Sequence, residues 1–152
     1  MIAAFANGGS ASVANTDHYW NLSGHLSRDV TETDKDIIFR SAGTLSNLYV
    51  VIQANTIAGT STIKTRKNAA DGNQTLSIGS SATGEFEDTT NTDSISAGDK
   101  LCTKFHPGAT TNTLNARLLS ALFDATTDTV TRMAATGPTA ITGASTTNYV
   151  SL

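Results

Sequence analysis

Three histidines and one cysteine are the residues best suited to bind a metal or to act as nucleophiles. His18 and His25 are too far apart in the chain for one strand face to present both to a metal, and His106 stands at the end of an expected strand. Cys102 is the single cysteine, so it forms no internal disulfide, and we interpret it as a small core residue. Because these positions match no zinc-site spacing, we predict no metal site and no cofactor.

The densest group of carboxylates consists of Glu85, Glu87, Asp88 and Asp93. Glu85 and Glu87 would share one face of a strand, and the two aspartates would flank a turn. Oxygen ligands of this kind suit calcium, but the spacing matches no calcium loop. Glycosidase carboxylates would need a groove with flanking aromatics, and the chain has few. We favour a structural role, because charges on an exposed strand prevent unwanted strand pairing.

Motifs for nucleophilic catalysis and phosphate binding are missing from the sequence. It contains no Gly-x-Ser-x-Gly elbow. Its glycine-containing loops at 8–9 and 79–84 are followed by neither a helix pattern nor a phosphate-binding lysine. We therefore predict that the protein is not an enzyme.

The composition argues against several classes of partner. Charged residues make up 15% of the chain, against about 25% in an average protein, and Ser, Thr and Asn supply about a third. The net charge of -3 and the lack of a basic patch predict no nucleic-acid binding. Apolar runs stay far below the ~20 residues of a membrane helix, which predicts no membrane contact. Residues 1–15 lack the basic region of a signal peptide, so we expect no export signal.

Short segments of alternating apolar and polar residues predict strands throughout the chain. The expected strands are 18–22, 37–40, 45–54, 62–68, 75–78, 85–88, 94–96, 100–106 and 112–123. A short helix is the alternative for the last of these, and a switch of apolar phase at 118–119 predicts a bulge if it is a strand. In 45–54 the more apolar set around Val50 should face the core, whereas 62–68 is polar enough to be a sheet edge or a solvated face.

Turn residues separate these segments, and those that we single out are Asn68, Asp71, Gly72, Gly84, Gly98 and Asp99. Asp71 and Gly72 form a hairpin-type pair, and 91–93 should turn the chain. Gly98 can adopt positive φ without steric cost, and Asp99 can bind nearby backbone amides. Asn68 could cap a turn in the same way. These roles are structural and involve no chemistry.

About eight short strands with regularly spaced turns predict an all-β sandwich or barrel, and our first choice is a jelly-roll β-sandwich of antiparallel strands. We divide the chain into an N-terminal arm at 1–16, the sandwich at 17–124, and a C-terminal tail or peripheral strands at 125–152. Both ends are rich in small and polar residues. We expect these extended arms to become ordered only against another protein.

The middle of the chain carries an ordered series of motifs at 62–72 (TIKTRKNAADG), 83–89 (TGEFEDT), 94–101 (SISAGDKL) and 120–123 (SALF). This series resembles a pattern in uncharacterised bacteriophage and prophage virion structural proteins. Its layout is similar to jelly-roll domains of the tumour-necrosis-factor and complement-C1q type, and that similarity implies a homotrimer. The resemblance covers about 45–123. Ala69 stands where the pattern has glycine, so this turn can differ in type.

Tyr19 and Trp20 are the most prominent aromatic pair. Such side chains bury a large apolar surface while keeping a polar tip. We interpret them as anchors of a subunit interface. Burial in the core of the subunit and a sugar-binding platform are the alternatives.

Taken together, the turn series, the Thr-rich low-charge composition and the missing export signal predict a virion protein that is assembled in the host cytoplasm. We expect an exterior capsid decoration or cement protein, or a fibre component. It would act by trimerisation and by contact with the major capsid protein or tail proteins. The alternative is a carbohydrate- or receptor-binding module of a phage tail fibre, whose ligand would be a surface glycan.

Overall fold

The computed structural model describes residues 2–3, 6–12, 16–22, 24–25, 29–110 and 112–126, which form an all-β protein with one turn of 3-10 helix. Its elements are β1 (Ile2–Ala3), β2 (Ala6–Ser12), β3 (His18–Trp20), β4 (Gly24–His25), η1 (Glu32–Asp34), β5 (Ile37–Ile38), β6 (Gly43–Asn55), β7 (Ser61–Lys67), β8 (Ala70–Ile78), β9 (Gly84–Ile95), β10 (Lys100–His106) and β11 (Thr113–Ala125). The helix considered for 112–123 is therefore wrong. None of the helical structure in the described part of the chain is long and apolar enough to cross a membrane.

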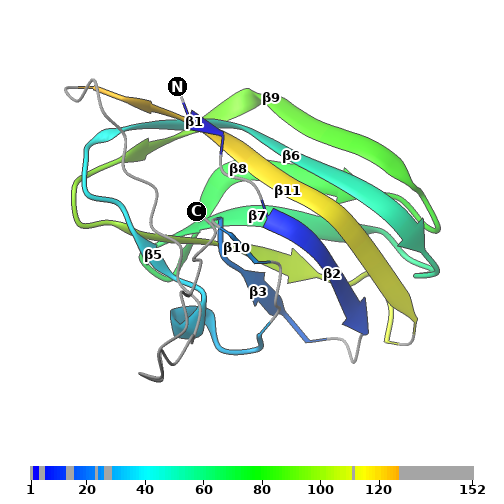
Figure 1. The fold of residues 1–152 in the computed structure, drawn as a ribbon. Coiled ribbons are helices and arrows are strands. Elements are labelled where there is room, and N and C mark those ends of the chain that lie inside the picture. Colours follow the sequence, from blue (N-terminus) through cyan, green and yellow to red (C-terminus); the bar gives the residue numbers. More distant parts are fainter. Residues whose placement is uncertain are drawn as a thin grey trace, which may run out of the picture.

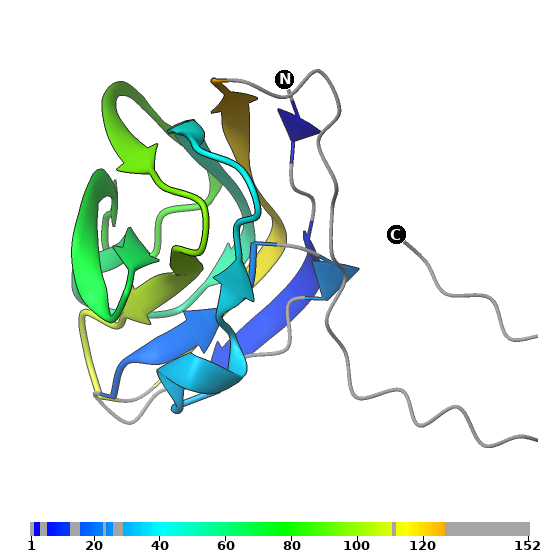
Figure 2. The same cartoon turned by 90° about the vertical axis from the view of Figure 1, so that its left-hand side faces the viewer.

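Two sheets pack face to face and form a β-sandwich (Figure 1). The larger sheet has the order β4-β2-β11-β6-β9, with β1 paired to β11, and the smaller sheet has the order β3-β10-β7-β8, with β5 paired to β10. Figure 2 shows β2 and β9 on opposite sides of β11 and β6 in the larger sheet. Four strands of one sheet, β2-β11-β6-β9, and four of the other, β3-β10-β7-β8, have the jelly-roll order, which confirms the predicted fold.

The core lies between the sheets, because successive side chains of a strand point to opposite faces. Its larger cluster consists of Trp20, Leu48, Val50, Ile52, Ile57, Ile63, Leu76, Ile78, Phe105, Leu114, Ala116 and Leu119. A smaller cluster at one end consists of Leu22, Ile37, Leu45, Ile95, Leu101, Ala121 and Phe123. Burying each large aliphatic side chain contributes about 1.5–3 kcal/mol, so these two clusters account for most of the hydrophobic stabilisation.

A bulge in β11 keeps its apolar residues on the core side over the whole strand. The register with β6 shifts between Ala116 and Leu118. Ala116 is buried before the shift, and Leu119 and Ala121 are buried after it. The predicted bulge is thus confirmed, but the extra residue is Arg117, just before the predicted 118–119, so Leu118 lies on the outer face.

A second bulge, which the alternation did not predict, lies in β6. The register with β11 shifts between Ser120, which lies opposite Tyr49, and Leu122, which lies opposite Ser46, and Asn47 has a φ of 52°. Val50 faces the core as predicted. Leu45 was expected on the other face, but the bulge turns it inward and it is 2% exposed.

The predicted N-terminal arm belongs in part to the larger sheet. β2 pairs antiparallel with β11, from Ser12 opposite Thr113 to Ala6 opposite Leu119, and β1 pairs with the end of the same strand. The arm prediction is wrong for these segments, because a free strand edge accepts a polar, Gly- and Ser-containing segment through backbone hydrogen bonds alone. From residue 127 onward, the predicted C-terminal tail lies outside the described residues.

Two further strand predictions need correction. β9 continues through the predicted turn at 91–93, where Thr92 and Asp93 pair with Ser46 and Leu45 of β6, although its register with β6 shifts just before, between Asp88 and Thr92. β7 is not a sheet edge, since it pairs with β10 on one side and β8 on the other. Its outer face is solvated as expected, with Lys64 and Arg66 partly exposed.

The β7–β8 hairpin turns at Asn68 and Ala69 rather than at Asp71 and Gly72. Both turn residues have positive φ, 51° and 65°, which is the geometry of a type I′ turn. Ala69 therefore adopts a backbone conformation that glycine adopts at lower cost. Asp71 and Gly72 lie in the strand that follows.

Candidate functional site

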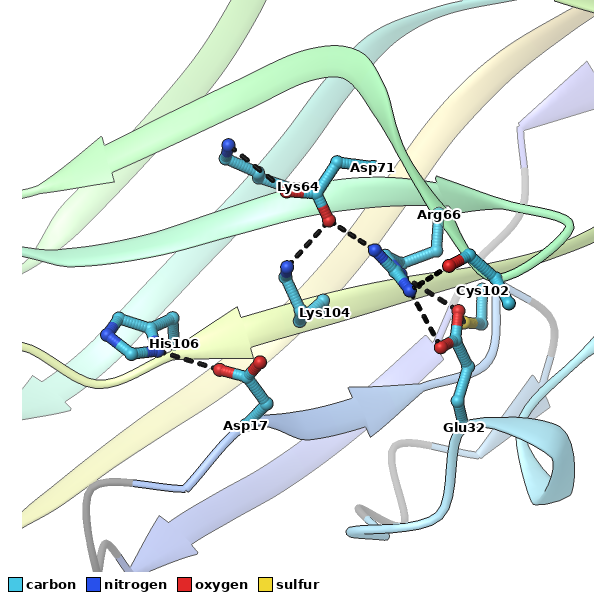
Figure 3. Close-up of polar contacts among 9 residues, drawn as sticks. Asp17, Glu32, Lys64, Arg66, Asp71, Cys102, Lys104 and His106 are labelled. Atoms are coloured by element: carbon cyan, nitrogen blue, oxygen red, sulfur yellow. Dashed lines mark hydrogen bonds and ion pairs between the residues drawn. The ribbon is translucent and has the colours of Figure 1, made fainter.

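The outer surface of the smaller sheet carries a group of charged side chains, which we call the charged face (Figure 3). It consists of Glu32, Lys64, Arg66, Asp71 and Lys104. Strand register places them together: Lys104 of β10 lies opposite Lys64 of β7, and Arg66 lies opposite Asp71 of β8. These outward positions alternate with core positions, so the pleat of the sheet brings the strand residues to one surface, and Glu32 joins them from η1.

Asp71 is the centre of this charged face. Its carboxylate pairs with Lys104 at 2.6 Å, with Lys64 at 3.3 Å, and with Arg66. Partial burial opposes its ionisation, but hydrogen bonds from Lys104 and Arg66 hold the pKa of Asp71 well below its usual range. Asp71 was predicted as a turn residue, and the structure instead gives it three cationic partners, two on the neighbouring β7 and one on β10 beyond it.

Arg66 connects the sheet to η1. Its Nε and Nη2 atoms donate to the two oxygens of Glu32 at 2.8 and 2.9 Å, a bidentate arrangement. The hydrogen bond to Glu32 raises the pKa of Arg66 further above its usual value, so the guanidinium stays charged. Arg66 also donates to the carbonyl oxygen of Ala69 in the hairpin turn. One side chain thus holds a loop segment and a turn against the sheet.

Cys102 lies beneath this pair, with its thiol on the outer side of the smaller sheet. Its Sγ and carboxylate oxygens of Glu32 and Asp36 lie within 4.8 Å of one another, close enough to share a cation. Both oxygens of Glu32 are already bound by Arg66. Burial raises the pKa of the Cys102 thiol, and the charge of Glu32 raises it further, so the sulfur remains protonated. The arrangement suits a thiol that donates to a carboxylate.

Further along β10, His106 Nδ1 lies 2.7 Å from a carboxylate oxygen of Asp17. Tyr19 lies opposite Lys104 in the neighbouring strand β3 and is partly exposed. Burial, followed by the charges of Glu32 and Asp17, raises the pKa of Tyr19, so its hydroxyl stays protonated at neutral pH. Tyr19 therefore lies at the rim of the charged face.

Trp20 points the opposite way from Tyr19 and lies in the core. Its side chain is 0% exposed and stacks on Phe105 with ring centroids 5.5 Å apart. The interface role expected for Trp20 is therefore wrong. The alternation of β3 places one aromatic outside and the other inside, and pairing with β10 puts the inner ring beside Phe105.

A second polar group joins the sheets where β8 and β9 run beside each other, and we call it the polar seam; it consists of Gln74, Asp88 and Asp93. Gln74 is 0% exposed. Its Oε1 accepts from the backbone N–H of Leu48 at 2.8 Å, and its Nε2 donates to the carbonyl oxygen of Leu45 at 3.2 Å. These backbone groups flank the β6 bulge, so Gln74 of one sheet holds the backbone of the other on both sides of the bulge.

Asp93 is the second member of the polar seam and is 4% exposed. It accepts from Thr65 Oγ1 and from the backbone N–H of Asn73, each at 2.6 Å, and from Gln74 at 3.2 Å. Gly72 leaves room for this carboxylate, since a Cβ there would lie 2.8 Å from an Asp93 oxygen. The glycine is required by this close approach and not by a turn.

Asp88, the third member, is 7% exposed. Its oxygens accept from the backbone N–H groups of Thr75 across the seam, and of Thr90 and Asn91 in its own strand, at 2.9 to 3.1 Å. Burial opposes its ionisation, but these N–H donors and the Asn91 amide outweigh it and lower the pKa of Asp88 to about 2. Asp88 thereby covers an N–H group on the free edge of β8.

The acidic group expected at 85–93 is thus divided between two sides of β9. Asp88 and Asp93 face inward, whereas Glu85 and Glu87 are exposed on the outer surface of the larger sheet. The four carboxylates do not converge, and the calcium and glycosidase alternatives lose their basis. The sequence analysis did not single out Gln74, although it shares the inward phase of Leu76 and Ile78. A polar residue at such a buried position needs a hydrogen-bond partner.

The remaining turn residues act as expected. Gly98 has a φ of 95°, and Asp99 accepts from the backbone N–H of Ser96 at 2.8 Å. Asn68 binds Asp99 through its amide nitrogen at 2.7 Å and accepts from the N–H of Lys100 at 2.9 Å. The β7–β8 hairpin turn and the turn before β10 are therefore joined by hydrogen bonds. Gly84 has a φ of 106° at the start of β9.

The outer surface of the larger sheet carries partly exposed apolar side chains, which we call the apolar face: Tyr49, Val51, Leu118 and Leu122. Val51 lies opposite Leu118 of β11 on one side and Glu85 of β9 on the other, and Tyr49 lies opposite Glu87. Burial and the adjacent Glu85 raise the pKa of Tyr49.

No protein-family model matches this chain, and no similar sequence is found among curated proteins.

Proposed function

We propose that this protein is a non-enzymatic structural component of a virus particle, most simply a bacteriophage, that acts by trimerisation and contact on the particle exterior. The observation that carries the proposal is the jelly-roll order of the two sheets, β2-β11-β6-β9 and β3-β10-β7-β8. It agrees with the fold that the turn series of 62–101 implies. The viral role itself rests on that resemblance and on the composition.

The hydrogen bonds of the ionisable side chains support a role in contact. The carboxylates of Asp71, Asp88, Asp93 and Asp99 each bind groups from a neighbouring strand or turn. A general acid or base needs a titratable group directed toward a substrate with its pKa near the working pH. Asp88, with a pKa of about 2, is instead committed to holding backbone N–H groups.

The glycan-binding alternative has weaker support. A sugar platform needs an exposed aromatic ring, and the indole of Trp20 is buried against Phe105. Tyr19 alone remains on the surface of β3. A tail-fibre module would therefore have to bind its receptor without the aromatic pair on which this hypothesis relied.

Sedimentation equilibrium of the purified full chain tests trimerisation. We expect a mass three times the 15.8 kDa of one chain. Mass spectrometry of intact particles, purified from cells in which the gene is induced, should detect the protein at a stoichiometry comparable with that of capsid or tail subunits. A monomer that is also missing from the particles would overturn the proposal. Binding to a glycan array that is lost in Tyr19→Ala would favour the alternative.

A further inference from the structure

β2 has little means of anchoring itself to the sheet through its side chains. Its sequence, ANGGSAS, contains no side chain larger than asparagine and no β-branched or aromatic residue. Glycine and asparagine are disfavoured in strands, and adjacent glycines add to the entropic cost of ordering the backbone. The strand is therefore held by its backbone hydrogen bonds rather than by the burial of large apolar side chains.

The place that β2 occupies is a slot between β11 and β4, and β2 runs along β11 in Figure 1. It pairs antiparallel with β11, from Ser12 opposite Thr113 to Ala6 opposite Leu119, and parallel with β4. β1 continues the pairing at the far end of β11. Without β2, the slot would present rows of backbone N–H and C=O groups on both sides, which is a template for any extended segment.

A segment of this composition specifies its partner only weakly. Gly-rich polar strands are prone to alternate pairing and domain swapping, because no large side chain depends on one partner for its burial. A short connection at 13–17 joins β2 to β3 in the other sheet, and short connections between strands are the hinges at which exchange occurs. The two described core clusters begin at Trp20, after this hinge, so moving β2 leaves their mutual contacts in place.

We propose that β1 and β2 are exchanged between copies of this chain, so that the segment of one subunit occupies the slot between β11 and β4 of the next. The segment and the slot are different parts of the chain, so the contact is heterologous. It closes into a ring of three when each subunit gives its segment to the next. The exchange forms the same strand pairs as the closed subunit and links the subunits physically. This inference rests on the proposed function, in which copies assemble, and names the contact that joins them.

Cysteines on the two sides of the β2–β11 pair distinguish exchange from closure. Ser10 lies opposite Asn115. Residues opposite each other in an antiparallel pair have Cα atoms about 4.5–5.5 Å apart, which a disulfide can bridge. Full-length Ser10→Cys and Asn115→Cys chains are produced in the same cell, purified together with reductant and then oxidised. Because a closed subunit of either kind lacks one of the two cysteines, exchange should give a covalent dimer of twice 15.8 kDa on a non-reducing gel.

Two further samples serve as controls and as a second measurement. Ser10→Cys produced with Ser77→Cys, an exposed position of β8 in the smaller sheet, is the matched control and should give no dimer. Cys102 is buried and present in every chain, so wild type oxidised in parallel reports any cross-link that it forms. Ser10→Cys and Asn115→Cys in one chain should give a covalent trimer after exchange, whereas a closed subunit gives a monomer with an internal disulfide.

The outcomes separate the two proposals when the mass of the wild type is measured by sedimentation equilibrium. A trimeric wild type whose double-cysteine chain runs as an internally linked monomer would overturn the exchange and leave the proposed function standing. A dimeric wild type that cross-links in the mixture would support the exchange and contradict the trimer. A wild type that is monomeric at all concentrations would overturn both the exchange and the trimer. If circular dichroism shows that a substitution prevents folding, the opposed pair Ser12→Cys and Thr113→Cys replaces it.

Discussion

Aspartate side chains bind different kinds of partner in the charged face and in the polar seam. Asp71 on the charged face is surrounded by Lys64, Arg66 and Lys104. Asp88 and Asp93 in the polar seam bind backbone N–H groups, a hydroxyl and an amide. The first arrangement neutralises charge at a surface, and the second satisfies hydrogen bonds in the interior.

This difference determines what each region contributes to the fold. Charge pairs at a surface contribute little, because water and salt screen them. A buried donor or acceptor without a partner costs about 1–3 kcal/mol, because folding removes it from water. We therefore expect the polar seam to control stability and the charged face to make a smaller, salt-dependent contribution. The following variants test that contrast.

Gln74→Met should have the largest effect. Methionine has a volume close to that of glutamine but removes the hydrogen bonds to the N–H of Leu48 and the carbonyl of Leu45 at the β6 bulge. We expect a loss of about 3 kcal/mol in the free energy of unfolding, measured by urea denaturation. Gln53→Met, at an exposed position of β6, is the matched control and should change stability by less than about 0.5 kcal/mol. Equal losses in the two variants would show that the bulge does not depend on Gln74.

Asp88→Asn should have an intermediate effect with a defined pH dependence. The amide loses one acceptor atom, so we expect a loss of about 2 kcal/mol at neutral pH. The pKa of Asp88 is lowered from 3.8 to about 2 on folding, so its contribution is complete above about pH 4 and is lost as the pH falls through 2.

Chemical denaturation across this window checks the prediction. The difference in stability between wild type and Asp88→Asn should shrink as the pH falls from 4 to 2. The difference between wild type and Asp124→Asn, an exposed carboxylate at the end of β11, should not follow that course. A gap between wild type and Asp88→Asn that stays constant to pH 2 would mean that its N–H bonds do not stabilise the charged form.

The same contrast explains how far the sequence predicts this molecule. The sandwich and its core faces are predictable because alternation directly reports which side chains are inward, as for Val50 and Leu76. Gln74 and Asp93 occupy the same inward phase as their apolar neighbours, so their burial could also be predicted from the sequence. Their partners could not be predicted, because Leu45, Leu48 and Thr65 lie on strands that are distant from them in the chain.

Two other features depend on pairing rather than on local pattern. The segment 91–93 has the composition of a turn, yet it belongs to β9, in which Thr92 and Asp93 pair with β6. Trp20 and Tyr19 are adjacent and alike, and only the register of β3 on β10 decides that Trp20 is buried against Phe105. The charged face was likewise not predictable, because Glu32 reaches Arg66 from a loop distant in the chain.

Asp71→Asn should have the smallest effect and the strongest dependence on salt. The Asp71 carboxylate is 36% exposed, so solvent screening reduces its pairing with Lys104 and Arg66, and we expect a loss of about 1 kcal/mol in dilute buffer. Removing it leaves three cations side by side, and added salt screens their repulsion. At about 1 M NaCl, where the Debye length is near 3 Å, the loss should fall to less than half, whereas the loss in Asp88→Asn should persist. If both losses respond to salt alike in parallel urea titrations, then the two regions are not energetically distinct, and the polar seam is as solvated as the surface.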